Sequence, residues 1–189
     1  MIETVLGPVP AAALGAVSTN EHVLTDSRGL RRPTREGGTL EGPIRPEVLG
    51  DLRWSWMSLA DNLTLDDPDT AVDELTRARA AGLGAIVEAT SWGMGPRHEM
   101  LPEISRRTGL HIVSAYGSYI DKTLPPWWSE LSEAAMERRF AQALTRAVPG
   151  TSFRAGLLGL LGTSAEITPA ELRALRAAGR AAAAAGCAV

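Results

Sequence analysis

The sequence predicts an α/β fold in which a parallel sheet is covered by helices. Short apolar runs alternate with amphipathic helical stretches along the whole chain. The apolar runs are nearly continuous, as expected of parallel strands that are buried on both faces. We expect residues 1–189 to form one unit with no second domain. The alternation alone does not distinguish an open doubly wound sheet from a closed barrel, although no Gly-x-Gly-x-x-Gly motif follows the first strand to favour a dinucleotide-binding fold.

The first third of the chain predicts a strand, a long connection and a helix. The strand spans residues 14–23. The connection continues through Asp61 and is mainly loop, with a short helix expected over residues 46–59. Residues 69–81 begin with acidic side chains and are followed by Gly82, which is the pattern of a complete helix.

The rest of the chain continues the same alternation. Further strands are predicted over residues 85–89, 111–115 and 153–158, and further helices over residues 100–108 and 131–148. The last helix has Thr168 as its N-cap, Pro169 at its first position and Glu171 at its third. Gly186 ends it, and residues 187–189 have the pattern of an opening fifth strand. Because an incomplete apolar strand leaves an unpaired edge, we expect the chain to be truncated at this point.

Composition excludes several classes of function. With 44% hydrophobic and 22% charged residues, the chain belongs among ordinary soluble globular domains. A formal charge of −3 and the absence of a basic run predict no nucleic-acid partner. No segment approaches the roughly 18 apolar residues that span a bilayer, and the N-terminus lacks the pattern of a signal peptide. The only cysteine, Cys187, excludes a disulfide framework and a cysteine-based zinc site, so a cytoplasmic location is expected.

Several segments share the order and spacing of one known family. They are Thr4–Pro8 with Leu14-Gly15, Asn20-Glu21-His22, Ile86–Thr90, Gly93–Arg97, Ile104–Val113, Arg154–Gly159 and Leu175–Ala178. Together they resemble the phosphotriesterase family of the amidohydrolase superfamily, which includes phosphotriesterase-like lactonases and phosphotriesterase-related proteins. Each motif is modest by itself, whereas their order over nearly the whole chain is specific. The resemblance implies the N-terminal half, about four β/α units, of a TIM-type (β/α)8 barrel.

The resemblance also implies a chemistry. Family members are hydrolases in which two divalent metal ions, usually zinc, activate a hydroxide that attacks a phosphoester, lactone or related ester. The expected partners are therefore a small-molecule ester substrate, a divalent metal and, by family, a second subunit in a homodimer. The metal ligands lie at the carboxyl ends of barrel strands.

The implied metal positions are only partly filled by suitable residues. Asn20 and His22 occupy the places of a His-x-His pair, whose members share one face of a strand because side chains alternate. An asparagine oxygen is a poorer zinc ligand than an imidazole nitrogen, which leaves His22 as the candidate ligand. The bridging-ligand position falls on Gly159 or Leu160, and neither coordinates a metal. We therefore expect impaired or absent hydrolysis in this chain.

Other residues have two interpretations each. Tyr119 and Trp128 follow the third family-like strand, where they either line a substrate pocket or pack against the loops and helix ends. His98 is expected to lie on the surface. Two alternatives to a working hydrolase stay open: a non-catalytic barrel that binds a small ligand or a partner, and a fragment without independent activity.

Overall fold

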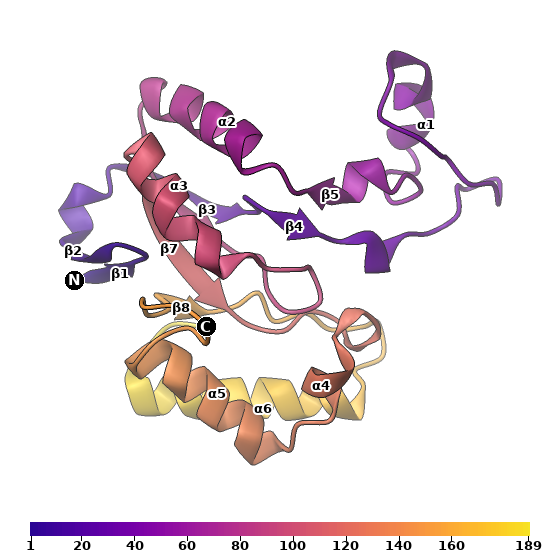
Figure 1. Cartoon of the computed structure of the whole chain (residues 1–189). Coiled ribbons are helices and arrows are strands. Elements are labelled where there is room, and N and C mark those ends of the chain that lie inside the picture. Colours follow the sequence, from indigo (N-terminus) through magenta and orange to yellow (C-terminus); the bar gives the residue numbers. More distant parts are fainter.

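Four parallel strands form a curved sheet in the computed structural model, which describes residues 1–189. Their order in the sheet is β3-β6-β7-β8, the same as their order in the chain. Their bounds are Ala16–Glu21 for β3, Leu83–Glu88 for β6, His111–Tyr116 for β7 and Leu157–Leu158 for β8. The sheet is a half-barrel, so the predicted α/β fold with four strand–helix units is confirmed (Figure 1).

One long helix follows each of these strands and covers the outer face of the sheet. The helices are α2 (Pro68–Ala80), α3 (Leu101–Thr108), α5 (Glu133–Thr145) and α6 (Pro169–Ala185). Helix α2 packs against α3, and α5 packs along α6 (Figure 1). None of the helices is long and apolar enough to cross a membrane.

An N-terminal hairpin precedes the half-barrel and is absent from the sequence prediction. Strands β1 (Ile2–Thr4) and β2 (Gly7–Val9) pair antiparallel, and the Val5 amide donates to the Ile112 carbonyl at 2.9 Å. The hairpin therefore packs at the amino-terminal end of the sheet. Its strands have three residues each, and β2 contains Gly7 and Pro8, so neither strand shows a period-2 pattern.

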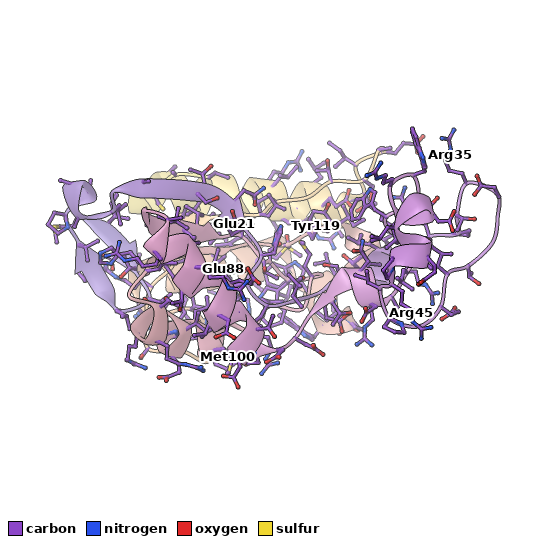
Figure 2. All side chains as sticks on the ribbon, turned by 90° about the horizontal axis from the view of Figure 1, so that it is seen from above. Glu21, Arg35, Arg45, Glu88, Met100 and Tyr119 are labelled. Carbon is purple, nitrogen blue, oxygen red and sulfur yellow. The ribbon has the colours of Figure 1, made fainter.

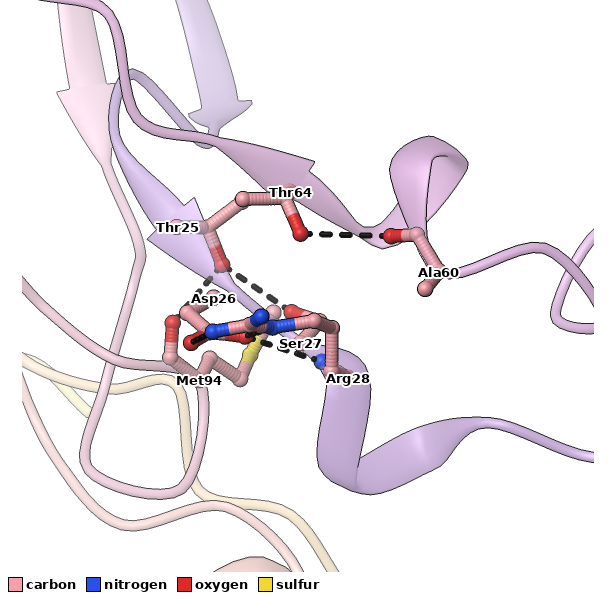
Figure 3. A network of polar contacts seen from close by, with 7 residues as sticks. All are labelled: Thr25, Asp26, Ser27, Arg28, Ala60, Thr64 and Met94. Carbon is pink, nitrogen blue, oxygen red and sulfur yellow. Dashed lines mark hydrogen bonds and ion pairs between the residues drawn. The ribbon is translucent and has the colours of Figure 1, made fainter. Parts of the chain in front are cut away.

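The long connection after β3 is less helical than predicted. The expected helix over residues 46–59 consists of a 3-10 turn and one helical turn, α1 (Leu49–Leu52), so the prediction is wrong beyond Arg53. Two short strands, β4 (Thr25–Asp26) and β5 (Thr64–Leu65), pair antiparallel and bring the ends of the connection together. Figure 3 shows the Thr25 hydroxyl, which donates to the Met94 carbonyl at 2.7 Å and ties this pair to the loop after β6.

The main core lies between the outer face of the sheet and α3, α5 and α6. Ile86, Ile112, Tyr116 and Phe140 are all fully buried in it. Trp128, in the one-turn helix α4 (Pro126–Ser129), is also 0% exposed, with its ring centroid 5.7 Å from that of Phe140. The structure therefore places Trp128 in the core and not at the rim of a pocket.

At the carboxyl end of the chain, the last residues lie along β8. The Leu158 amide donates to the Ala188 carbonyl at 3.1 Å. This bond places Ala188 beside β8, but residues 187–189 form no strand, so the predicted opening of a fifth strand is not observed.

A buried carboxylate connects the loops at the carboxyl ends of β7 and β8. Glu171 is 2% exposed and accepts hydrogen bonds from the backbone amides of Asp121 (2.9 Å), Ser164 (3.0 Å) and Thr168 (2.9 Å). The Thr168 hydroxyl accepts from the Glu171 amide, which completes a capping box at the start of α6. Burial opposes ionisation of Glu171, but these hydrogen bonds outweigh it and lower its pKa to about 2.

We predict that Glu171→Gln destabilises the protein by about 2 kcal/mol at pH 7. Because the folded-state pKa lies below the ordinary value of 4.5, this contribution is present above pH 4.5 and is lost as the pH falls toward about 2. Chemical denaturation at pH 7 and at pH 3 measures it. Glu166→Gln, a change of the same kind at an exposed site in the same loop, serves as the control. An equal loss from both variants at pH 7 would contradict the role of Glu171.

Candidate functional site

The carboxyl ends of the four strands surround a cavity of about 380 Å³. Its lining is mostly apolar: Val87, Ala89, Ala115, Leu157, Leu158, Gly159, Leu160, Leu161 and Val189, with Thr19 and Asn20. The cavity lies on the inner side of the half-barrel, at the carboxyl ends of the strands, where (β/α)8-barrel enzymes have their active sites. Asn20 supplies the only side-chain amide there, and no charged side chain lines the cavity.

The structure does not bring Asn20 and His22 together. Asn20 lines the strand-end cavity, whereas His22 lines a separate cavity of about 350 Å³ between the end of β3 and α2. The pairing of β3 with β6 is irregular between Ser18 and Glu21, so the simple alternation that predicts a shared face is broken there. In this structure Asn20 and His22 therefore face different cavities, and His22 turns toward the helix layer.

Thr90 holds the ring of His22. The Nδ1 atom of His22 lies 3.1 Å from the Thr90 hydroxyl, and that hydroxyl donates its proton to the Glu88 carboxylate. When Glu88 is ionised and accepts the Thr90 proton, the Thr90 oxygen is left to accept from His22, so Nδ1 of His22 carries the hydrogen and Nε2 carries a free lone pair. Burial lowers the pKa of His22, partly offset by the charge of Glu21, so the ring is neutral near pH 7.

Glu88 anchors this network. Its carboxylate is 2% exposed and accepts from the backbone amides of Val23 and Thr90, both at 3.2 Å. Burial raises the pKa of Glu88 to about 7, although the hydrogen bonds from Thr90 and Val23 favour the charged form. Figure 2 shows Glu88 and Glu21 in the middle part of the molecule, well away from Arg35 and Arg45 on the protruding connection. The sequence contained a signal that our prediction did not use, namely a glutamate inside the apolar run 85–89.

The end of β8 offers no metal ligand. Gly159 has no side chain and Leu160 has an apolar one. The backbone of Gly117 passes close to that of Gly159: a Cβ added to Gly117 would lie 2.5 Å from the Gly159 carbonyl oxygen. No three His, Cys, Asp or Glu side chains are grouped so as to hold a metal ion. By the chemistry of its donors, this chain does not fit a two-metal centre.

His98 is buried in the structure, whereas Tyr119 is half-buried. A Cβ added to Gly162 would lie 2.5 Å from the Tyr119 ring, which therefore fills the space beside the loop after β8. His98, expected on the surface, is 5% exposed, so that prediction is wrong. Burial lowers the pKa of His98 to about 4, and its ring lies 5.7 Å from that of Tyr116.

The fold and this edge define the class of protein: half of a (β/α)8 barrel with a cavity at the carboxyl ends of its strands. The phosphotriesterase family model matches residues 1–189, and the chain belongs to the phosphotriesterase family. The N-acetyltaurine hydrolase of Tetraodon nigroviridis is 32% identical over 191 residues, covering 100% of this chain and 55% of that protein. The rat N-acetyltaurine hydrolase is 31% identical with the same coverage. The chain thus spans about half the length of the curated relatives it matches.

Comparison with solved structures also matches this chain to about half of a longer protein. A resiniferatoxin-binding protein from Rhodobacter sphaeroides superposes with a TM-score of 0.92 at 33% identity, covering 98% of this chain and 53% of that one. A lactonase from Listeria monocytogenes superposes with a TM-score of 0.73 at 22% identity, covering 97% of this chain and 54% of that one, which supports the fold alone. The half-barrel of this chain therefore corresponds to about half of a phosphotriesterase-family barrel.

We predict that Thr90→Val releases the His22 ring from its single tautomer. Valine keeps the shape of threonine but removes the hydroxyl that accepts from Nδ1, at a cost of about 1–2 kcal/mol in stability. At a pH well above the Glu88 pKa of about 7, nitrogen NMR of the imidazole rings should show Nδ1–H for His22 in the wild type and a shift toward Nε2–H in the variant. Thr145→Val, at an exposed position near the end of α5, should leave the His22 signals unchanged. An Nε2–H tautomer in the wild type would contradict the assignment.

Proposed function

We propose that this chain forms one wall of a small-molecule site in a phosphotriesterase-family barrel, and that the wall recognises its ligand without binding metal. The observation that carries the proposal is the strand-end cavity. Its lining is apolar, with Asn20, Gly159 and Leu160 standing where the family resemblance implies metal ligands. Such a surface favours a neutral, largely apolar molecule, because burying an unpaired charge against it would be costly.

The Asn20 amide is the natural point of polar recognition. It presents two donors and an acceptor beside a mostly apolar surface, where Thr19 is the other polar side chain, so a ligand carbonyl or hydroxyl can be oriented by it. Lactones, esters and amides with apolar skeletons combine these two features. The name of the Rhodobacter relative, a resiniferatoxin-binding protein, supports small-molecule binding as a role for this half of the barrel.

Hydrolysis of an ester, lactone or amide is the second candidate, and the family match favours it. The relatives include N-acetyltaurine hydrolases and lactonases. His22 is the one residue of this chain that we propose as a ligand for a zinc ion. Its neutral ring and free Nε2 lone pair suit that role, but it lacks a partner on β3 or β8. Under this candidate, the complete protein would draw its other ligands from residues outside the four strands described.

Location and assembly follow the same reasoning. We propose a cytoplasmic protein, since its single cysteine, Cys187, is free. A homodimer, as implied by the family resemblance, is part of the proposal as well.

We predict that the purified chain binds dihydrocoumarin, an aromatic lactone, without hydrolysing it, and retains less than one zinc ion after dialysis against zinc. Calorimetry, absorbance assays and metal analysis measure these three quantities. Leu160→Glu should weaken lactone binding by about tenfold or more, because it places a charge in the apolar wall. Leu49→Glu, an exposed position on the protruding connection, should leave binding unchanged.

The two candidates are distinguished by the same experiment. Lactone hydrolysis that is proportional to bound zinc and is lost in His22→Ala would replace the binding proposal with the hydrolase. Lactone binding that is equal in wild type and Leu160→Glu would contradict the proposed wall.

A further inference from the structure

A second polar cavity lies at the opposite end of the sheet from the strand-end cavity. Its volume is about 410 Å³, and the N-terminal hairpin forms one side of it. The other sides come from one face of α3, through Pro102 and Arg106, from the residue just after α5 and from the segment before β8. In Figure 1 the hairpin lies at the left, at the amino-terminal ends of the strands. This cavity shares no lining residue with the strand-end cavity.

Three arginines line this cavity, whereas only one carboxylate does. The arginines are Arg106, Arg146 and Arg154, and the carboxylate is Glu3. Glu3 forms an ion pair with Arg154. Arg106 contacts Glu103 at 3.1 Å, but Glu103 is 58% exposed and does not line the cavity. Arg146 has no carboxylate within ion-pair distance, so positive charge is in excess.

The excess positive charge is carried by guanidinium groups, which are suited to binding phosphate-bearing anions. A guanidinium group is always charged and presents a planar fork of donors that matches phosphate oxygens. The hydroxyl of Ser152, which makes no hydrogen bond within the protein, adds a neutral donor at the same cavity. An anion between the three arginines would also offset their mutual repulsion.

We propose that this cavity binds a small phosphate-bearing anion, such as inorganic phosphate or a phosphate monoester. The cavity volume falls within the roughly 300–1,000 Å³ of small-molecule sites. The site is independent of the strand-end cavity and of the function proposed for it. It is built from the first residues of the chain and from residues near the end of α5, so a bound phosphate joins segments that lie far apart in the sequence. Phosphate should therefore stabilise the folded chain, because it binds the assembled site only.

The test is calorimetric titration of the full chain with inorganic phosphate and with pyrophosphate at constant ionic strength. We expect saturable binding of one anion per chain. Arg146→Gln should weaken it by about tenfold, the usual scale for one charge-assisted hydrogen-bonded group. Arg77→Gln, on the distant helix α2 where Arg77 pairs with Glu74, should change affinity by less than about twofold. Binding that is absent, or weakened equally by both variants, would overturn the proposal.

Thermal melting provides a second readout. Phosphate should raise the melting temperature of the wild type and of Arg77→Gln more than an equal ionic strength of sodium chloride does, and this difference should shrink in Arg146→Gln. Co-sedimentation with phosphatidic acid vesicles distinguishes a free phosphate from a lipid headgroup. Binding to vesicles without binding to free phosphate would overturn the assignment to a small soluble ligand.

Discussion

The pairing of β6 with its two neighbours is the constraint on which the rest of the structure depends. On one side β6 pairs with β7 in regular parallel register from Ala85 opposite His111 to Glu88 opposite Ser114. On the other side it pairs with β3, and there the register shifts twice. Ala85 and Ile86 are fully buried at the centre of this arrangement, so the sheet cannot move relative to the helices without exposing them. The regular β6–β7 pairing sets the geometry of the half-barrel. The irregular β3–β6 pairing determines which side chains line the candidate site.

The irregular side has a direct chemical consequence. Because the register changes between Ser18 and Glu21, Asn20 lines the strand-end cavity while His22 turns away and contacts Thr90. The buried carboxylate of Glu88 then stabilises that arrangement through Thr90 and the Val23 amide. His22, the residue of this chain best suited to bind a metal, is therefore held in a hydrogen-bond network on the helix side of the sheet. The strand-end cavity is left with the Asn20 amide, the Thr19 hydroxyl and apolar groups, which is why ligand recognition is better supported than metal chemistry.

The sequence predicted most of the fold and little of the site. Buried strands such as Leu83–Glu88, and the capped helix beginning at Thr168, carry strong local patterns, so they were predicted nearly at their observed bounds. The N-terminal hairpin and the β4–β5 pair have two or three residues per strand, too few for periodicity to detect. The helix expected after Pro46 ends at Leu52, and the connection is held by the pairing of β4 with β5 and by buried side chains such as Leu59. At the site, ideal strand alternation predicted a pair that a local irregularity separates, and the role of Glu88 depends on burial that no local pattern reveals.

The strand-end wall offers no set of metal ligands, and His22 faces away from it. The most direct measurement is a crystal structure of this chain grown in excess zinc chloride, with anomalous scattering recorded at the zinc absorption edge. The account predicts no zinc peak within about 2.5 Å of Asn20 or of the backbone at Gly159 and Leu160, and a His22 ring hydrogen-bonded to Thr90. A zinc ion bound jointly by Asn20 and His22 at the mouth of the half-barrel would contradict it.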